Sequence, residues 1–216
     1  MLEPTISIVD RLAAARYDLP KLRKQLDAPL ARLGAEHRMN GGKSITHMMP
    51  WTSPSKDNWL VLFHYSTERV RVHTLLWFLD VEGNAAAIWT GASGMAYHIQ
   101  ADAIASYAER FDPTADALER VQSFFLDNPF FEMQVERPQG QHHWDVSVGM
   151  HQGLGLGVWD ATTDIVHVRS FVPLTDVMEP GAPQDALRSP FDGLSLQQRI
   201  ELADRAAEEE RRQRAA

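Results

Sequence analysis

The sequence predicts an α+β fold built on one strongly bent antiparallel sheet that closes toward a half-barrel, with helices at its ends and a C-terminal helix. Helical and strand patterns come in blocks along the chain, in the order helices, strands, helices, strands and helix. A parallel α/β sheet would instead alternate single strands with single helices. Short turns separate the strands within each block, which is typical of an antiparallel meander.

The first block, residues 6–37, is predicted to be helical because its leucines recur at roughly helical spacing. Pro20 is expected to open a second helix, where the missing backbone N–H of proline does no harm. Gly34 is a candidate for the C-terminal end of that helix. The glycines that follow Asn40 then break the helical pattern.

A strand-rich block follows this break. Strands are predicted at 43–51, 58–65, 69–81 and 85–90, with a turn at 82–84. The two middle strands carry apolar residues on both faces, so both faces of the sheet should be covered.

Two more helices and a second strand block come next. Helices are predicted at 100–111 and 114–126, with Thr114 as an N-cap, and strands at 131–137, 143–149, 153–159 and 165–172. Residues 173–190 contain four prolines and are interpreted as irregular chain. A last helix is expected at 196–214, after Ser195. The organisation is therefore a helical segment at 1–42, an α+β core domain at 43–174, and an irregular segment with the C-terminal helix at 175–216.

Composition limits the function classes. Hydrophobic residues make up 44% of the chain, enough for a substantial core, and the absence of cysteine excludes disulfides, zinc–thiolate sites and thiol nucleophiles. No signal peptide and no membrane-spanning run are recognisable, so a cytoplasmic protein is expected. The net charge of −8 disfavours a broad nucleic-acid-binding surface, although a local basic patch is compatible with it.

The stretch 149–172 is the best candidate for a functional site. It is interpreted as a β-hairpin whose first strand alternates glycine with apolar residues, so that one face of that strand is bare. With a turn at 161–163, Gly157 is expected opposite His167 and Gly155 opposite Arg169. An imidazole and a fixed cation would then stand over a floor formed by Gly155 and Gly157, the expected ligand-binding residues.

The second strand of this hairpin alternates His167 and Arg169 with Val166 and Val168. The valines are expected to face the core. His167 and Arg169 should then face solvent, a cleft or a covering helix.

His98 is the third candidate catalytic residue. It precedes the helix predicted at 100–111, whose N-terminus would lower the pKa of the imidazole and keep it neutral. The far end of that helix carries Tyr107 and Arg110, a short pattern similar to helices of small RNA-cleaving toxins.

No metal or cofactor is predicted. His143, Asp145 and His151 share one face of a strand, but His143 and His151 would lie about 26 Å apart at 3.3 Å per residue unless the chain bends at Gly149. The glycine-rich motifs that bind phosphate or dinucleotides are absent from the sequence.

The six tryptophans have two interpretations. Large aromatic side chains suit a half-buried strand, which favours a role in the core. An aromatic-lined ligand cavity between the two strand blocks is the alternative.

These residues lead to two main functional hypotheses. The first is a soluble intracellular binding or regulatory module with a cleft beside the glycine-rich hairpin. The alternative is a metal-independent hydrolase, with RNA among its substrate classes, in which His167 or His98 is the general acid/base and Arg169 stabilises negative charge. A structural interaction protein that uses its terminal helices is a third hypothesis. The sequence does not identify a ligand or partner, and it leaves open whether the chain forms a homo-oligomer.

Overall fold

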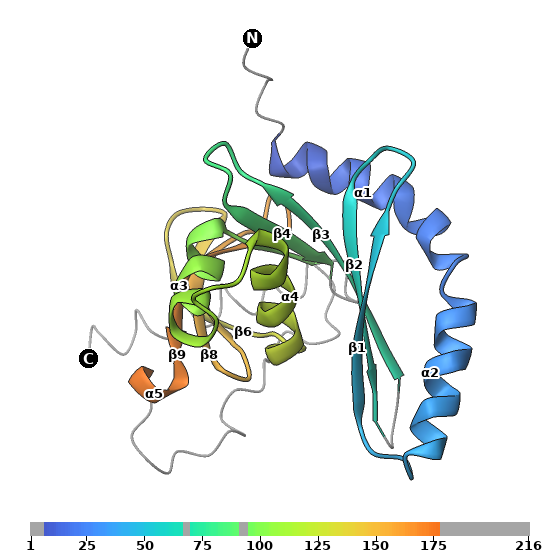
Figure 1. The fold of residues 1–216 in the computed structure, drawn as a ribbon. Coiled ribbons are helices and arrows are strands. Elements are labelled where there is room, and N and C mark those ends of the chain that lie inside the picture. The colour runs from blue at the N-terminus through green and yellow to red at the C-terminus, as the bar shows by residue number, and fades with distance from the viewer. Residues whose placement is uncertain (1–6, 67–69, 91–94, 178–216) are drawn as a thin grey trace.

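The computed structural model describes residues 7–66, 70–90 and 95–177 (Figure 1). The helices are α1 (Ile8–Arg23), α2 (Asp27–Met39), α3 (Ala101–Phe111), α4 (Ala117–Asp127) and the short α5 (Leu174–Val177). The strands are β1 (Ile45–Thr52), β2 (Asn58–Tyr65), β3 (Val70–Leu79), β4 (Ala85–Thr90), β5 (Ala96–Ile99), β6 (Glu132–Pro138), β7 (His143–Gly149), β8 (Gly153–Asp160) and β9 (Ile165–Pro173). The helix predicted at 196–214 lies outside the described residues.

All nine strands belong to one sheet, in the order β1-β2-β3-β4-β5-β9-β8-β7-β6. It consists of two antiparallel meanders joined side by side by β5 and β9, which run parallel. The sheet curls without closing. The helices α3 and α4 lie inside the curl, where α3 contacts β4 and β9 while α4 contacts β1, β2 and β4 (Figure 1). The predicted α+β class and the strong bend of the sheet are therefore confirmed, although the parallel pairing of β5 with β9 makes the sheet mixed and not wholly antiparallel.

Each face of the sheet has its own core. The first face packs against α3 and α4 through a cluster that includes Trp89, Tyr107, Phe124, Trp159 and Val166. The second face packs against α1 and α2 through a cluster that includes Leu12, Leu22, Leu33, Trp59 and Phe63. Alternate residues of each strand belong to opposite faces, so the apolar runs of the middle strands serve both cores.

The predictions for the first two helices were wrong in detail. Pro20 lies inside α1, three residues before its end, and Gly34 lies inside α2. The true end of α2 is set by Gly41 and Gly42, which have positive φ angles of 66° and 77°. Such φ values are easily reached only by glycine, and the Gly42 amide donates to the His37 carbonyl across the helix end.

Two further details depart from the sequence pattern. Strand β5 was not predicted, because four residues are too few to establish an alternation and α3 begins almost at once after them. The N-cap of α4 is Asp116 rather than Thr114. Asp116 accepts from the Glu119 amide and Glu119 accepts from the Asp116 amide, which completes a capping box.

The register of the β8–β9 hairpin also differs from the prediction. His167 lies opposite Val158, and Gly157 lies opposite Val168. The register shifts between Leu156 and Gly157, so that Arg169 is an extra residue on β9 without a partner position on β8. This β-bulge is the feature that alternation alone could not reveal.

As a result, the glycines of β8 do not form a floor beneath His167 and Arg169. Gly155 and Gly157 lie on the first face, and the bare strand face is filled by the core. A Cβ atom at Gly155 would lie 2.8 Å from Met150 Cε and 2.8 Å from Val168 Cγ1, and one at Gly157 would overlap the His167 carbonyl. Val166 and Val168 face the core as predicted, since both are buried in the first-face cluster.

This packing makes a prediction about glycine substitutions. Gly157→Ala should lower the free energy of unfolding by about 1–3 kcal/mol or more, because the methyl group meets backbone that cannot move aside. Gly34→Ala is the matched control, since a Cβ there meets nothing closer than 3.7 Å. It should raise the free energy of unfolding by about 0.5–1 kcal/mol, as alanine replaces glycine inside a helix. Urea unfolding of both variants checks this, and equal effects would contradict the tight β8–β9 contact.

Candidate functional site

A row of paired residues on the second face changes from apolar to largely polar where the two meanders meet. On β1 to β4 the row is apolar, and on β5, β9, β8, β7 and β6 it is largely polar: Trp51, Trp59, Leu76, Ile88, His98, His167, Val158, Asp145, Arg137. The helices α1 and α2 lie along the N-terminal meander (Figure 1). Two predicted site residues, His98 and His167, stand at the boundary between the two halves.

The parallel pairing of β5 with β9 brings these two histidines together. His98 Nδ1 and His167 Nδ1 are 3.1 Å apart, and the two rings meet edge to face with their centroids 5.3 Å apart. His98 is 8% exposed, and its ring stacks on that of Phe78 at 6.2 Å. A hydrogen bond between two neutral imidazoles needs one Nδ1–H donor and one bare Nδ1 acceptor. The accepting ring must then carry its proton on Nε2.

Burial keeps this pair neutral. Desolvation, and secondly the charge of His167, lowers the pKa of His98 to about 4. Burial also lowers the pKa of His167, Asp160 opposes the shift, and Arg169 and His143 add to it. The expected cause for His98 was wrong, because His98 lies within β5 and not at a helix N-terminus.

Arg169 shares the second face with His167. Its position in the bulge of β9 leaves the side chain exposed, and its charge lowers the pKa of both His167 and Asp145. Arg137 forms an ion pair with Asp145. Within the described residues, the Arg169 guanidinium has no ion pair or hydrogen bond. It is therefore an exposed cation on the polar half of the second face.

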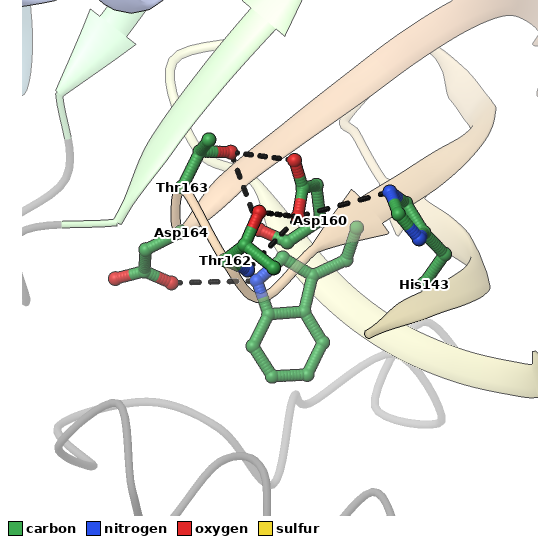
Figure 2. Close-up of polar contacts among 6 residues, drawn as sticks. His143, Asp160, Thr162, Thr163 and Asp164 are labelled. Carbon is green, nitrogen blue, oxygen red and sulfur yellow. Dashed lines mark hydrogen bonds and ion pairs between the residues drawn. The ribbon is translucent and has the colours of Figure 1, made fainter. Parts of the chain in front are cut away.

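Asp160 holds the turn between β8 and β9 in place by hydrogen bonds (Figure 2). Its Oδ1 accepts from the Thr162 amide at 2.8 Å and from the Thr162 hydroxyl at 2.6 Å, while its Oδ2 accepts from the Thr163 hydroxyl at 3.0 Å. His143 Nε2 lies 3.8 Å from Oδ1. Burial alone would raise the pKa of Asp160, but the hydrogen bonds from Thr162 and Thr163 outweigh it and leave the pKa lowered. Asp160 is thus an ionised structural carboxylate rather than a free acid.

The structure also places the other residues that the sequence singled out. Tyr107 belongs to the first-face core and donates to Asp127, so it is separated from His98 by the sheet. His143 and Asp145 are on the second face, as expected from their spacing. Among the described residues no group of three His, Cys, Asp or Glu side chains is arranged to hold a metal ion. The residues that sequence reasoning missed are Asp160 and Arg137, which only strand pairing brings to this face.

Comparison with known proteins identifies no relative of this chain. No protein-family model, curated protein or solved structure matches the chain. No helix in the described ranges has the length and apolar character needed to cross a membrane.

The buried histidine pair makes stability depend on pH. The pKa of His98 is about 4 in the folded chain and about 6.5 in the unfolded chain, so its contribution is fully present above pH 6.5 and is lost as the pH falls toward 4. His98→Asn keeps a hydrogen-bonding group for His167 but does not titrate. Between pH 7 and pH 4.5, the free energy of unfolding of the wild type should therefore fall by about 2–3 kcal/mol more than that of the variant.

Urea unfolding of both proteins at several pH values measures this difference. Desolvation also lowers the pKa of His73, but His73 is present in both proteins and cancels in the comparison. Identical pH dependence of the two proteins would contradict a neutral, buried His98.

Proposed function

We propose that this chain is an intracellular binding module that holds an anionic group of its ligand on the second face, at Arg169 and His167. The observation that carries the proposal is Arg169 itself. It is an exposed guanidinium on a rigid strand, and among the described residues no carboxylate is paired with it. Its neighbour Asp145 is already paired with Arg137.

The chemistry of these two side chains suits a carboxylate or a phosphate. A guanidinium presents planar N–H donors that match two oxygens of such a group. His167 adds an imidazole on the same face, and its Nε2 carries a proton whenever its Nδ1 accepts from His98. Val166 and Val168, buried on the other side of β9, restrain the backbone that carries both groups. Restraint before binding reduces the entropy lost on binding.

The hydrolase hypothesis has less support. General acid/base catalysis needs an imidazole that titrates near the working pH and a second group to exchange protons with it. His98 and His167 are hydrogen-bonded to each other, and burial lowers the pKa of both. The nearby carboxylate of Asp160 is held by its own turn. Binding therefore accounts for more of the geometry than hydrolysis does.

The test is a titration of ¹⁵N-labelled protein with inorganic phosphate at constant ionic strength. The Arg169 Nε–H resonance, assigned through Arg169→Gln, should shift in a saturable way, with a dissociation constant on the order of 1 mM, an affinity of about 4 kcal/mol. Arg169→Gln should abolish binding and change the free energy of unfolding by less than about 0.5 kcal/mol. Arg32→Gln, on the exposed side of α2, is the matched control and should bind as the wild type does.

Two results would contradict the proposal. One is an equal, non-saturating shift of all exposed arginines, which would mean ionic screening without a site. The other is cleavage of single-stranded RNA in the presence of a chelator, lost in both His167→Asn and Arg169→Gln, which would favour the hydrolase.

A further inference from the structure

The bulge in β9 places a cation next to an exposed leucine on the second face. Leu156 of β8 pairs with Ser170 of β9, and the next residue of β8, Gly157, pairs with Val168. Arg169 is the extra residue between these two pairs. In a β-bulge two residues of one strand oppose a single residue of the other, so Arg169 and Ser170 both lie opposite Leu156. Since opposite residues of neighbouring strands have their Cβ atoms about 5 Å apart, the Arg169 side chain begins beside that of Leu156.

Leu156 belongs to a continuous line of apolar side chains. It is 41% exposed, although β8 lies inside the sheet between β7 and β9. Single exposed leucines are common on protein surfaces, but apolar residues that adjoin one another are typical of interaction sites. Strand β8 contributes three alternate residues to the second face, and Val172 of β9 pairs with the first of them. We call these four residues the apolar stripe: Leu154, Leu156, Val158, Val172.

The polar groups that border the apolar stripe on β7 are already paired. Ser147, opposite Leu156, donates to Glu136 at 2.6 Å. Asp145, opposite Val158, forms the ion pair with Arg137. A partner that contacts the stripe therefore meets the positive charge of Arg169 at its border, and a carboxylate complements that charge.

The shape of this surface suits a polypeptide partner. Helices α3 and α4 pack on the first face, inside the curl, so the second face is the outer side of the sheet (Figure 1). Sites for small molecules are usually concave and enclose most of the ligand. The outer face of a sheet instead suits a partner that brings its own contact area, and arginine is enriched in such protein interfaces.

We propose that the ligand of the Arg169 site is an acidic peptide segment of a partner protein. One carboxylate of the segment binds the Arg169 guanidinium, and an adjacent apolar side chain packs on Leu156. This inference rests on the proposed function, because it names the ligand class of the same site.

The test compares three capped dipeptides in titrations of the ¹⁵N,¹³C-labelled full chain. N-acetyl-aspartyl-leucinamide carries both groups, N-acetyl-aspartyl-glycinamide lacks the isobutyl group, and N-acetyl-asparaginyl-leucinamide lacks the charge. The first should shift the Arg169 Nε–H and the Leu156 methyl resonances in a saturable way. It should bind about fivefold more tightly than either of the others, a difference of about 1 kcal/mol.

Two variants assign the apolar contact to Leu156. Leu156→Ser should remove the difference between the two aspartyl peptides and leave phosphate binding at Arg169 as in the wild type. Leu126→Ser is the matched control, because Leu126 is 38% exposed and lies on α4. It should retain the fivefold difference. If Leu156→Ser does not fold, the comparison of the three peptides on the wild type decides alone.

Three results would overturn the proposal. The first is equal affinity for the two aspartyl peptides. The second is equally tight binding of hexanoate, which would assign the surface to a small amphiphile. The third is a shift of the Leu156 methyl resonances with protein concentration alone, which would assign it to a second copy of the chain. If phosphate binds at Arg169 while the aspartyl peptides do not differ, this inference fails and the proposed function stands, whereas an Arg169 that responds to no anion contradicts both.

Discussion

The parallel pairing of β5 with β9 joins two meanders that would otherwise each end in an open edge. Unpaired backbone N–H and C=O groups at a sheet edge are costly to bury and prone to pair with other chains. Here the Ala96 amide donates to the Asp164 carbonyl at 3.1 Å, and the Gln100 amide donates to the Val168 carbonyl at 2.9 Å. The chain then enters α3, which contacts β9 on the first face. The continuous first-face core, with residues from both meanders, depends on this junction.

The same junction also creates the histidine pair. A polar side chain that is 8% exposed costs free energy unless it finds a partner, and His167 is that partner for His98 only because β5 and β9 are in register at this point. The cost is not fully offset, since both imidazoles are held neutral by burial. Places where local chemistry conflicts with packing are where function is most often found. The boundary between the apolar and polar halves of the second face is such a place.

The local sequence pattern predicted most of the fold but little of the candidate site. Alternation and turn residues predicted β2 and β4 with their observed bounds, because apolar residues in these strands are dense and Gly83 and Asn84 mark the turn before β4. The sequence also placed His167 and Arg169 on the face opposite Val166 and Val168, which follows from the period of a strand. It did not predict β5, the parallel junction or the bulge at Arg169, because each depends on contacts between residues far apart in the chain. For that reason the glycines were assigned to a ligand floor, when in fact Gly155 meets core side chains and Gly157 meets the backbone of β9. The proximity of His98 to His167 was not anticipated for the same reason.

Native-state hydrogen exchange measures the junction most directly. If the β5–β9 pairing unites the two meanders, the amides of Ala96 and Gln100 should exchange only through global unfolding. Their free energies of exchange should then equal those of the slowest amides in β2 and β8 and should decrease with denaturant at the same slope. If the β6–β9 meander exchanges at a distinctly lower free energy than the β1–β5 meander, with the junction amides following the weaker half, the two meanders unfold separately. That result would contradict the dependence of the fold and the histidine pair on this single parallel contact.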